Sequence, residues 1–281
     1  MDLDALCKKA EAFRGMHDRS RILVLPNAWD AMSARIFEAA GFKAIATTSA
    51  GVSYAVGYPD GELIPRDEMI AAVARIARCV EVPVTADMES GFGQTPDDVA
   101  ETVRLVINAG AVGVNLEDTI HGAGRTLHEI AVAAERIRSA RVAAQAAGVP
   151  IVINARTDVY LLGIGEKVAR FDQAVSRLNA YRAAGADCLY AMGYLDAETI
   201  GRLVKAVNGP LNVIGVPGMP PVAELERLGV ARVSTASGPT RVAMTATRKS
   251  ADELMRTGSF DVFGGDTMSH PDANALMVRR A

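Results

Sequence analysis

The chain has 281 residues, of which 49% are hydrophobic and 22% are charged, and its formal net charge is -3. This length and apolar content suit one large domain with a full core, so a single domain over residues 1–281 is expected. A slightly acidic chain without a basic cluster gives no support for a nucleic-acid partner.

Cysteine usage and the N-terminal pattern favour a cytoplasmic protein. Cys7, Cys79 and Cys188 are widely scattered, and their spacing matches neither a metal-ligand motif nor a disulfide framework. The N-terminus lacks a basic segment followed by an apolar one, so no signal peptide is predicted. No apolar run is long enough to span a bilayer, and we expect no membrane partner.

Short apolar, β-branched runs alternate along the chain with Ala-, Arg- and Glu-rich helical stretches. The predicted strands are residues 22–25, 44–47, 82–85, 112–115, 151–154, 188–191, 211–214 and 231–234. Glycines such as Gly110 and Gly185 end helices just before strands, as expected for left-handed cap residues. Eight βα units in a chain of this size predict an α/β fold, a (β/α)8 TIM barrel. A doubly wound open sheet is the alternative, although no Gly-x-Gly-x-x-Gly turn follows the first strand.

A polar tail follows the last predicted helix, from 258 to 281. It contains Gly264-Gly265 and His270-Pro271. A monomeric barrel does not need such a segment, so we expect the tail to pack on a neighbouring subunit.

The richest local pattern is residues 84–93, where an apolar run ends in two carboxylates, Asp87 and Glu89, before a glycine-rich turn. Two acids at the end of a buried strand are costly to desolvate unless a cation shares them. Mg²⁺ takes oxygen ligands, usually one or two carboxylates with waters and substrate oxygens. The pattern therefore suggests a metal site at the mouth of the barrel. A solvated acidic strand end is the simpler alternative.

The neighbouring strand ends carry further candidates. Strand 2 leads into Thr48-Ser49-Ala50-Gly51 and then Asp60, strand 4 ends at Glu117, and strand 5 ends at Arg156. Catalytic groups of barrels gather at these strand ends. The acids would hold a divalent cation, and the arginine would bind an anionic substrate group such as a carboxylate or phosphonate. The Thr-Ser-Ala-Gly turn would present N–H groups to a second anionic group.

Taken together, the residues at these strand ends make the chain resemble the isocitrate lyase/phosphoenolpyruvate mutase superfamily. The matching motifs are Pro26-Asn27-Ala28-Trp29-Asp30, Ser33-Ala34-Arg35, Gly57-Tyr58-Pro59-Asp60, Ala86-Asp87-Met88-Glu89-Ser90-Gly91-Phe92-Gly93, Asn115-Leu116-Glu117-Asp118 and Ile153-Asn154-Ala155-Arg156-Thr157-Asp158. The resemblance runs from about residue 21 to residue 257. It implies a (β/α)8 barrel, Mg²⁺ or Mn²⁺ as cofactor, and small 2-oxo acid substrates. It also implies a homotetramer, a dimer of dimers in which helix 8 is swapped between subunits.

The resemblance also assigns roles to individual residues. Asp87 resembles the direct metal ligand, and Glu89 and Glu117 resemble acids that hold the metal's waters. Glu89 stands where aspartate is more usual, but it still supplies a carboxylate. Asp60 resembles the acid beside the reacting bond, and Arg156 resembles the anion-binding arginine. The turn that grips the pyruvyl carboxylate is matched by Thr48 and the N–H groups of Ser49 and Ala50.

The loop after strand 4 separates the subfamilies. Residues 118–125 read Asp-Thr-Ile-His-Gly-Ala-Gly-Arg. Isocitrate and methylisocitrate lyases carry the motif Lys-Lys-Cys-Gly-His there, and phosphonopyruvate enzymes carry Lys-Thr-Asn. Residues 118–125 of this chain contain neither motif. His121 titrates near neutrality when unperturbed and is a candidate acid/base, with a solvated loop residue as the alternative. The glycines around Ala123 suggest a mobile lid.

The predicted activity is therefore a Mg²⁺-dependent lyase or decarboxylase. Its substrate would be a small 2-oxo or malate-type acid, cleaved through a metal-stabilised enolate of pyruvate. Phosphonomutase or phosphonopyruvate hydrolase chemistry at a P–C bond is the first alternative. A barrel that binds a dicarboxylate without turning it over is the second.

Overall fold

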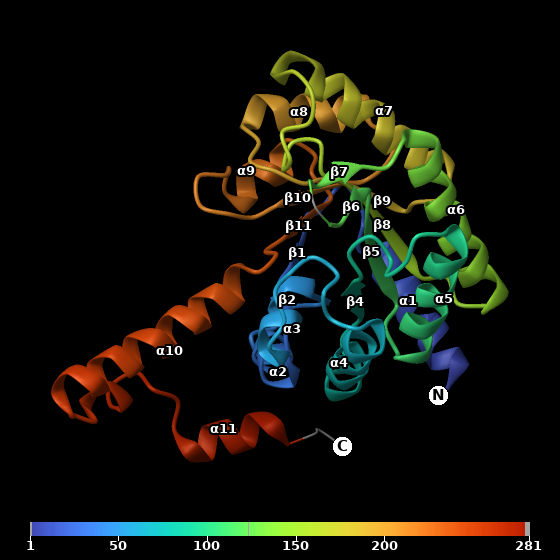
Figure 1. Ribbon diagram of the computed structural model, residues 1–281. Coiled ribbons are helices and arrows are strands. Elements are labelled where there is room, and N and C mark those ends of the chain that lie inside the picture. The colour runs from blue at the N-terminus through green and yellow to red at the C-terminus, as the bar shows by residue number, and fades with distance from the viewer. Residues whose placement is uncertain (1, 123, 279–281) are drawn as a thin grey trace.

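The computed structural model describes residues 2–122 and 124–278, and its centre is a nearly closed barrel of parallel strands (Figure 1). The strand order is β1-β11-β10-β9-β8-β5-β4-β3-β2. The strands are β1 Leu23–Leu25, β2 Asn27–Ala28, β3 Ile45–Thr47, β4 Val84–Asp87, β5 Gly113–Glu117, β8 Val152–Thr157, β9 Cys188–Ala191, β10 Leu211–Ile214 and β11 Arg232–Ser234. Each predicted strand is present.

The barrel closes through the short segment that contains β1 and β2. The strand is interrupted between them at Pro26, which has no N–H to donate. On one side of this proline β1 pairs with β11, and on the other side β2 pairs with β3. The two ends of the sheet are therefore consecutive pieces of the same chain. This confirms the barrel prediction, and the doubly wound open sheet was wrong.

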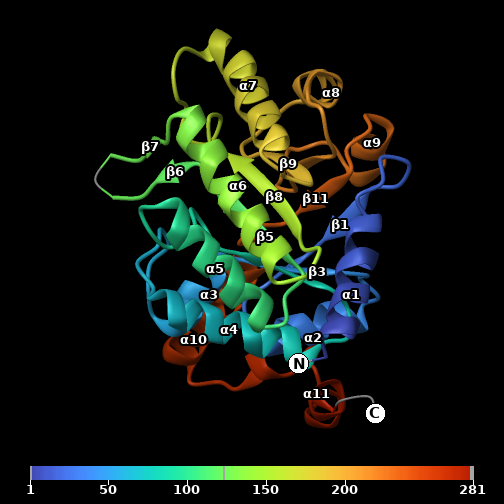
Figure 2. The ribbon, with the colours of Figure 1, turned by 90° about the vertical axis from the view of Figure 1, so that its right-hand side faces the viewer.

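Most of the helices surround the barrel, as expected for crossover connections between parallel strands, whereas the last two extend away from it (Figures 1 and 2). The helices are α1 Leu3–Gly15, α2 Ala31–Ala39, α3 Ser49–Val56, α4 Arg66–Cys79, α5 Pro96–Asn108, α6 Ile130–Ala146, α7 Arg170–Ala183, α8 Ala197–Ala206, α9 Val222–Arg227, α10 Gly238–Thr257 and α11 His270–Met277, with 3-10 turns at Lys167–Ala169 and Asp261–Phe263. Their buried apolar side chains form the core between helices and sheet, for example Ile76, Val103 and Leu178. None of the helices described is both long and apolar enough to cross a membrane.

The amino ends of the strands are closed by α1. Phe13 of this helix is fully buried near Gly113, the first residue of β5. A Cβ atom at Gly113 would lie 2.8 Å from Cε1 of Phe13 and 2.6 Å from Oγ1 of Thr85, so a larger residue would not fit. Because this end is plugged, the carboxyl ends of the strands are left for a ligand.

The C-terminal segment leaves the barrel along α10 and then returns (Figure 1). Thr240 is the one buried residue of α10, whereas Val242 is 70% exposed and Met255 is 87% exposed. The chain comes back to α2, where Arg35 donates hydrogen bonds to the carbonyls of Leu276 (2.9 Å) and Val278 (2.8 Å). Packing of residues 258–281 on another subunit and a swap of the eighth barrel helix, which is α10, stay predictions.

Candidate active site

A cavity of about 240 Å³ opens at the carboxyl ends of the strands. It is lined by all nine residues that the sequence singled out: Thr48, Ser49, Ala50, Asp60, Asp87, Glu89, Glu117, His121 and Arg156. Other lining residues include Arg125, Asp158 and Met192. The barrel thus gathers groups that are more than a hundred residues apart into one space.

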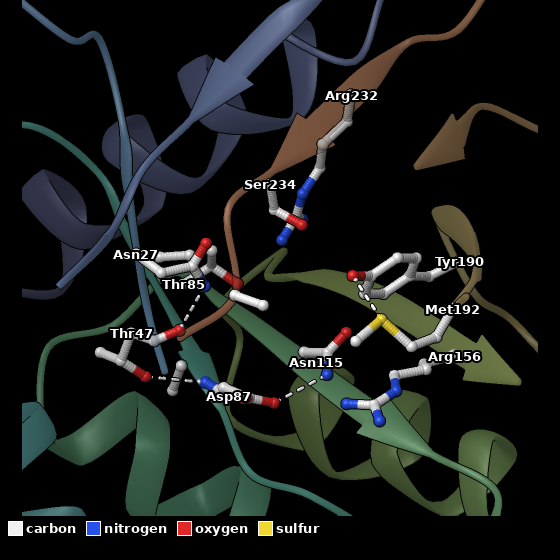
Figure 3. Close-up of a pocket in the computed structure, with 13 residues that line it drawn as sticks. Asn27, Thr47, Thr85, Asp87, Asn115, Arg156, Tyr190, Met192, Arg232 and Ser234 are labelled. Atoms are coloured by element: carbon white, nitrogen blue, oxygen red, sulfur yellow. Dashed lines mark hydrogen bonds between the residues drawn. The ribbon is translucent and has the colours of Figure 1, made fainter. Parts of the chain in front are cut away.

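Asp87 lies at the end of β4 and is held by three hydrogen bonds. Its Oδ2 accepts from the backbone N–H of Ser49 (3.0 Å) and from the Ser49 hydroxyl (2.9 Å). Its Oδ1 accepts from Nδ2 of Asn115 (2.8 Å), whose Oδ1 in turn accepts from Asn154 (2.7 Å; Figure 3 shows the first of these two bonds). These bonds fix the direction of the carboxylate. They also mean that the Ser49 N–H, expected to contact substrate, points at Asp87 in this structure.

The turn after β4 is fixed by Glu62, a residue that sequence reasoning missed. One Glu62 carboxylate oxygen accepts from the N–H (2.9 Å) and hydroxyl (2.7 Å) of Ser90 and from the N–H of Phe92 (2.9 Å). The N–H of Glu62 donates to Oε2 of Glu89 at 2.7 Å. Glu62, Glu89 and Phe92 all have left-handed backbones, with φ of 57°, 47° and 56°. Non-glycine residues hold such strain where the surroundings over-determine it, often at functional sites.

The carboxylic acids that line the cavity have raised pKa values, because burial and their mutual repulsion outweigh the nearby positive charges. Burial, followed by the charges of Glu117, Asp60 and Asp87, raises the pKa of Glu89 to about 9. Burial also raises the pKa of Glu117 to about 7, although Arg156 acts in the opposite direction. Burial and then Asp87 raise the pKa of Asp60. Each shift means that the site disfavours another negative charge.

This electrostatic pattern fits a divalent cation. Oε1 of Glu89 is buried and has no hydrogen-bond partner within residues 2–122 and 124–278, so an acceptor faces the cavity unused. Over the same residues, no three His, Cys, Asp or Glu side chains form a direct metal-ligand cluster. The unused oxygen of Glu89, in one cavity with the carboxylates of Asp87 and Glu117, would suit a cation that keeps several of its waters, as Mg²⁺ usually does.

Arg156 extends from β8 into the cavity and is paired with two acids. Its Nε and Nη2 donate to the two carboxylate oxygens of Asp158 at 2.6 and 2.8 Å, and its Nη1 lies 2.6 Å from Oε2 of Glu117. Burial lowers the pKa of Arg156, but Asp158 and Glu117 outweigh it and hold the pKa well above its usual range. A guanidinium has five N–H donors, so some remain for a ligand.

His121 lies on the hairpin formed by β6 (Thr119–Ile120) and β7 (Thr126–Leu127), and its side chain is only 12% exposed. Its Nε2 lies 3.1 Å from Oε1 of Glu117 and 3.6 Å from Oε2 of Glu89. Burial lowers the pKa of His121, but the contact with Glu117 and the charge of Glu62 raise it by more than burial lowers it. The pKa is therefore higher than usual. The side chain thus lines the cavity instead of standing in solvent. Position 123 of the expected lid lies outside the described residues.

Two supporting side chains hold the loops that carry these residues. Asp118 accepts hydrogen bonds from Thr157 (2.7 Å), Tyr181 (2.7 Å) and the N–H of Asp158 (3.0 Å). These bonds tie the gate loop, the loop after β5 that begins at Asp118, to the end of β8. From α6, Arg136 donates to the carbonyl oxygens of Ser90 (2.6 Å) and Gly93 (2.9 Å). Nothing in the local sequence distinguished Arg136 from other helical arginines, since its partners come from a distant turn.

The cysteines lie away from the residues that line the cavity. Cys188 is fully buried in β9, and burial raises the pKa of its thiol to about 11. The thiols of Cys7 and Cys79 contact the backbone carbonyls of Gly148 and Ile76. The arrangement agrees with chemistry that uses no thiol.

Comparison with known sequences and structures places this geometry in context. The family model described as phosphoenolpyruvate phosphomutase matches residues 13–255. An uncharacterized protein of Mycobacterium tuberculosis is 36% identical over 81% of this chain and 83% of its own length. Escherichia coli 2-methylisocitrate lyase is 30% identical over 84% of this chain and 79% of its own length. Pseudomonas aeruginosa oxaloacetate decarboxylase is 31% identical over 78% of this chain and 75% of its own length.

Solved structures show the same architecture. A lyase/mutase candidate from Burkholderia cenocepacia superposes with a TM-score of 0.89 at 40% identity, covering 98% of both chains. The structure of 2,3-dimethylmalate lyase, a member of the PEP mutase/isocitrate lyase superfamily, superposes with a TM-score of 0.85 at 28% identity, covering 95% of this chain and 94% of that one.

Proposed function

The chain belongs to the phosphoenolpyruvate mutase/isocitrate lyase superfamily, and from that premise we propose that it is a Mg²⁺-dependent lyase or decarboxylase. Its substrate class would be small 2-oxo or malate-type acids, cleaved to yield pyruvate or a substituted pyruvate through the enolate. The observation that carries the proposal is the cavity in which Asp87, Glu89 and Glu117 stand beside Arg156. Carboxylates for a cation next to a guanidinium suit an anionic oxo acid.

When bound, a divalent cation supplies positive charge beside the oxygen that becomes negative as the bond to C3 breaks. The protein's own residues do the rest. Asp87 is oriented by Ser49 and Asn115, so it would not need to reorganise on binding. Arg156 would bind a substrate carboxylate with the donors that Asp158 leaves free.

Two side chains of the cavity with raised pKa values are candidates for the general acid. Asp60 and His121 both line the cavity and both hold a proton more readily than usual. Either one would protonate the departing group or the enolate carbon, as a general acid does. The hairpin that carries His121 would exclude water while the enolate exists.

Several named relatives act on C–C bonds, whereas the matching family model is described as phosphoenolpyruvate phosphomutase. Their names include 2-methylisocitrate lyase, oxaloacetate decarboxylase and 2,3-dimethylmalate lyase. The gate loop of this chain lacks a cysteine. We therefore favour a thiol-independent reaction, either decarboxylation or cleavage of a substituted malate.

The exposed face of α10 supports the proposed assembly. Apolar side chains along and after this helix are open to solvent in the single chain, among them Val242, Met244 and Phe260. Large apolar side chains exposed together mark interaction surfaces. A homotetramer with α10, the eighth barrel helix, exchanged between subunits would cover them, and light scattering measures the mass directly.

A substrate screen tests the proposed function. Oxaloacetate, phosphonopyruvate and substituted malates are incubated with the protein and Mg²⁺, and pyruvate is followed by NMR. We expect activity that EDTA abolishes and Mg²⁺ restores, and a loss of more than about a hundredfold in Asp87→Ala. The control is Asp97→Ala, an exposed acid of α5.

Each outcome of the screen has a meaning. Turnover of phosphonopyruvate alone would favour the mutase or hydrolase alternative. Binding of the acids without any product would favour a barrel that only binds. Full activity in Asp87→Ala, or indifference of the wild type to EDTA, would refute the metal assignment.

A further inference from the structure

A second chamber lies inside the barrel, below the cavity at the strand ends (Figure 3). Its volume is about 30 Å³, and it shares Asp87, Arg156, Met192 and Ala236 with the outer cavity. The remaining wall comes from the strands, including Asn27, Thr85, Tyr190, Arg232 and Ser234. The two spaces are therefore adjacent. One ligand could extend through both, or each space could hold a ligand of its own.

Arg232 is the unusual member of this wall. It lies on β11, and Figure 3 shows its side chain running inward from the strand toward the residues around the chamber. The residue is only 2% exposed, yet its Nε and Nη1 have no hydrogen-bond partner in the part of the chain that the structure describes. A buried charge is strongly unfavourable unless it is paired.

The acids nearby do not pair with this guanidinium. Asp87 is the carboxylate that acts on it, but its two oxygens are already bound by Ser49 and Asn115. Cys188 and Tyr190 also face Arg232, and their pKa values are raised by burial to about 11 and about 12, so both are neutral at physiological pH. Within the described part of the chain, the Arg232 guanidinium therefore lies inside the barrel without a carboxylate bound directly to it.

Thr85 offers a second unused polar group in the same chamber. Its Oγ1 is buried and lacks a hydrogen-bond partner among the described residues. A hydroxyl can donate one hydrogen bond. A guanidinium and a hydroxyl that both lack partners and line one small space would together satisfy an anionic acceptor.

We propose that this inner chamber is an anion subsite, built around Arg232 and Thr85, for a group no larger than a carboxylate. A space of about 30 Å³ accommodates roughly two waters, since one water needs about 10–15 Å³. A halide ion or a single carboxylate group suits that size, whereas a phosphate is too large. Arg156 lines both spaces, so the inner subsite is set apart by Arg232 and Thr85, which line only the chamber.

The anion has two possible sources. A free halide would occupy the chamber in the resting protein. A carboxylate at the far end of a substrate bound in the outer cavity would also fit, and this source rests on the proposed function. The two sources are separated by testing halides without metal or substrate.

The first experiment measures thermal unfolding in EDTA, with sodium chloride or bromide against sodium gluconate at equal ionic strength. We expect chloride and bromide to raise the Tm of the wild type relative to gluconate, and Arg232→Met to lose this response. In gluconate the variant is expected to melt at or above the wild-type temperature, because an unpaired buried charge has been removed. Arg35→Met, at the surface contact with the C-terminal segment, should keep the halide response.

The second experiment compares 2-oxoglutarate with 2-oxopentanoate, which lacks the distal carboxylate, by calorimetry in Mg²⁺. A carboxylate in the chamber should favour 2-oxoglutarate by at least about tenfold, and Arg232→Met should erase that preference. Thr85→Val keeps the charge and should weaken whichever response is present, which covers the case in which Arg232→Met does not fold.

A halide response that depends on Arg232 supports the subsite even if no substrate is turned over. A preference for 2-oxoglutarate alone identifies the substrate as the source of the anion. If neither ligand gives a response that Arg232→Met or Thr85→Val reduces, the inference is overturned.

Discussion

Replacing Arg156 separates its structural role from its role in ligand binding. The residue is bound to Asp158 through two hydrogen bonds and contacts Glu117, and both acids are buried. Removing one partner of a buried ion pair costs about 3–5 kcal/mol, mainly because the other charge is left unpaired. Arg156→Met is therefore expected to lower the free energy of unfolding by about that amount.

Asp158→Asn in the same chain compensates for the lost cation. The double variant has no unpaired charge at position 158, and Glu117 can take up a proton because burial already raises its pKa to about 7. Urea unfolding should show the double variant recovering most of the stability lost in Arg156→Met. Asp158→Asn alone is the matched control, since it keeps the guanidinium.

Binding should not recover in the double variant. A charge-assisted hydrogen bond is worth about 1.5–3 kcal/mol, so the affinity for pyruvate with Mg²⁺ should fall roughly tenfold to over a hundredfold. Calorimetry of the three variants measures this affinity. A double variant that regains both stability and pyruvate affinity would show that Arg156 is only a structural partner of Asp158.

Two further predictions concern the cysteines with the gate loop, and the stability at acid pH. A variant with Cys7 and Cys79 changed to Ser and Cys188 to Ala should keep its rate of pyruvate formation, whereas His121→Asn should lower kcat by about a hundredfold; loss of turnover in the folded cysteine variant would return the protein to the thiol-dependent lyases. Burial and then the charge of Arg232 lower the pKa of His17 from 6.5 to about 3. Its folded pKa lies below its unfolded one, so its contribution is full above pH 6.5 and is lost as the pH falls toward 3. Between pH 7 and 5 that loss is about 2 kcal/mol, and His17→Gln should show a flatter pH profile of urea unfolding; an unchanged slope would refute it.

The strands and the acidic strand ends were predictable because their signals are local. An apolar β-branched run bounded by turn residues predicts a strand from its own few residues, and the strand predicted at residues 82–85 is present as β4, two residues further along the chain. Strand ends in a barrel converge on one face, so the order of strands alone implied that Asp87, Glu117 and Arg156 would line one cavity. Closure of the barrel also followed from the number of βα units.

The partners of each side chain were decided only by the tertiary structure. Which oxygen faces Arg156, and whether His121 turns inward, depend on the register between β5 and β8 and on the path of the hairpin. Two residues illustrate this: Glu62 holds the turn after Asp87, and Arg232 faces the inner chamber, where its Nε and Nη1 have no hydrogen-bond partner among the described residues. Burial and pairing are set by contacts between distant segments, so amino-acid type and spacing determine which groups reach the mouth, but not how each one is neutralised there.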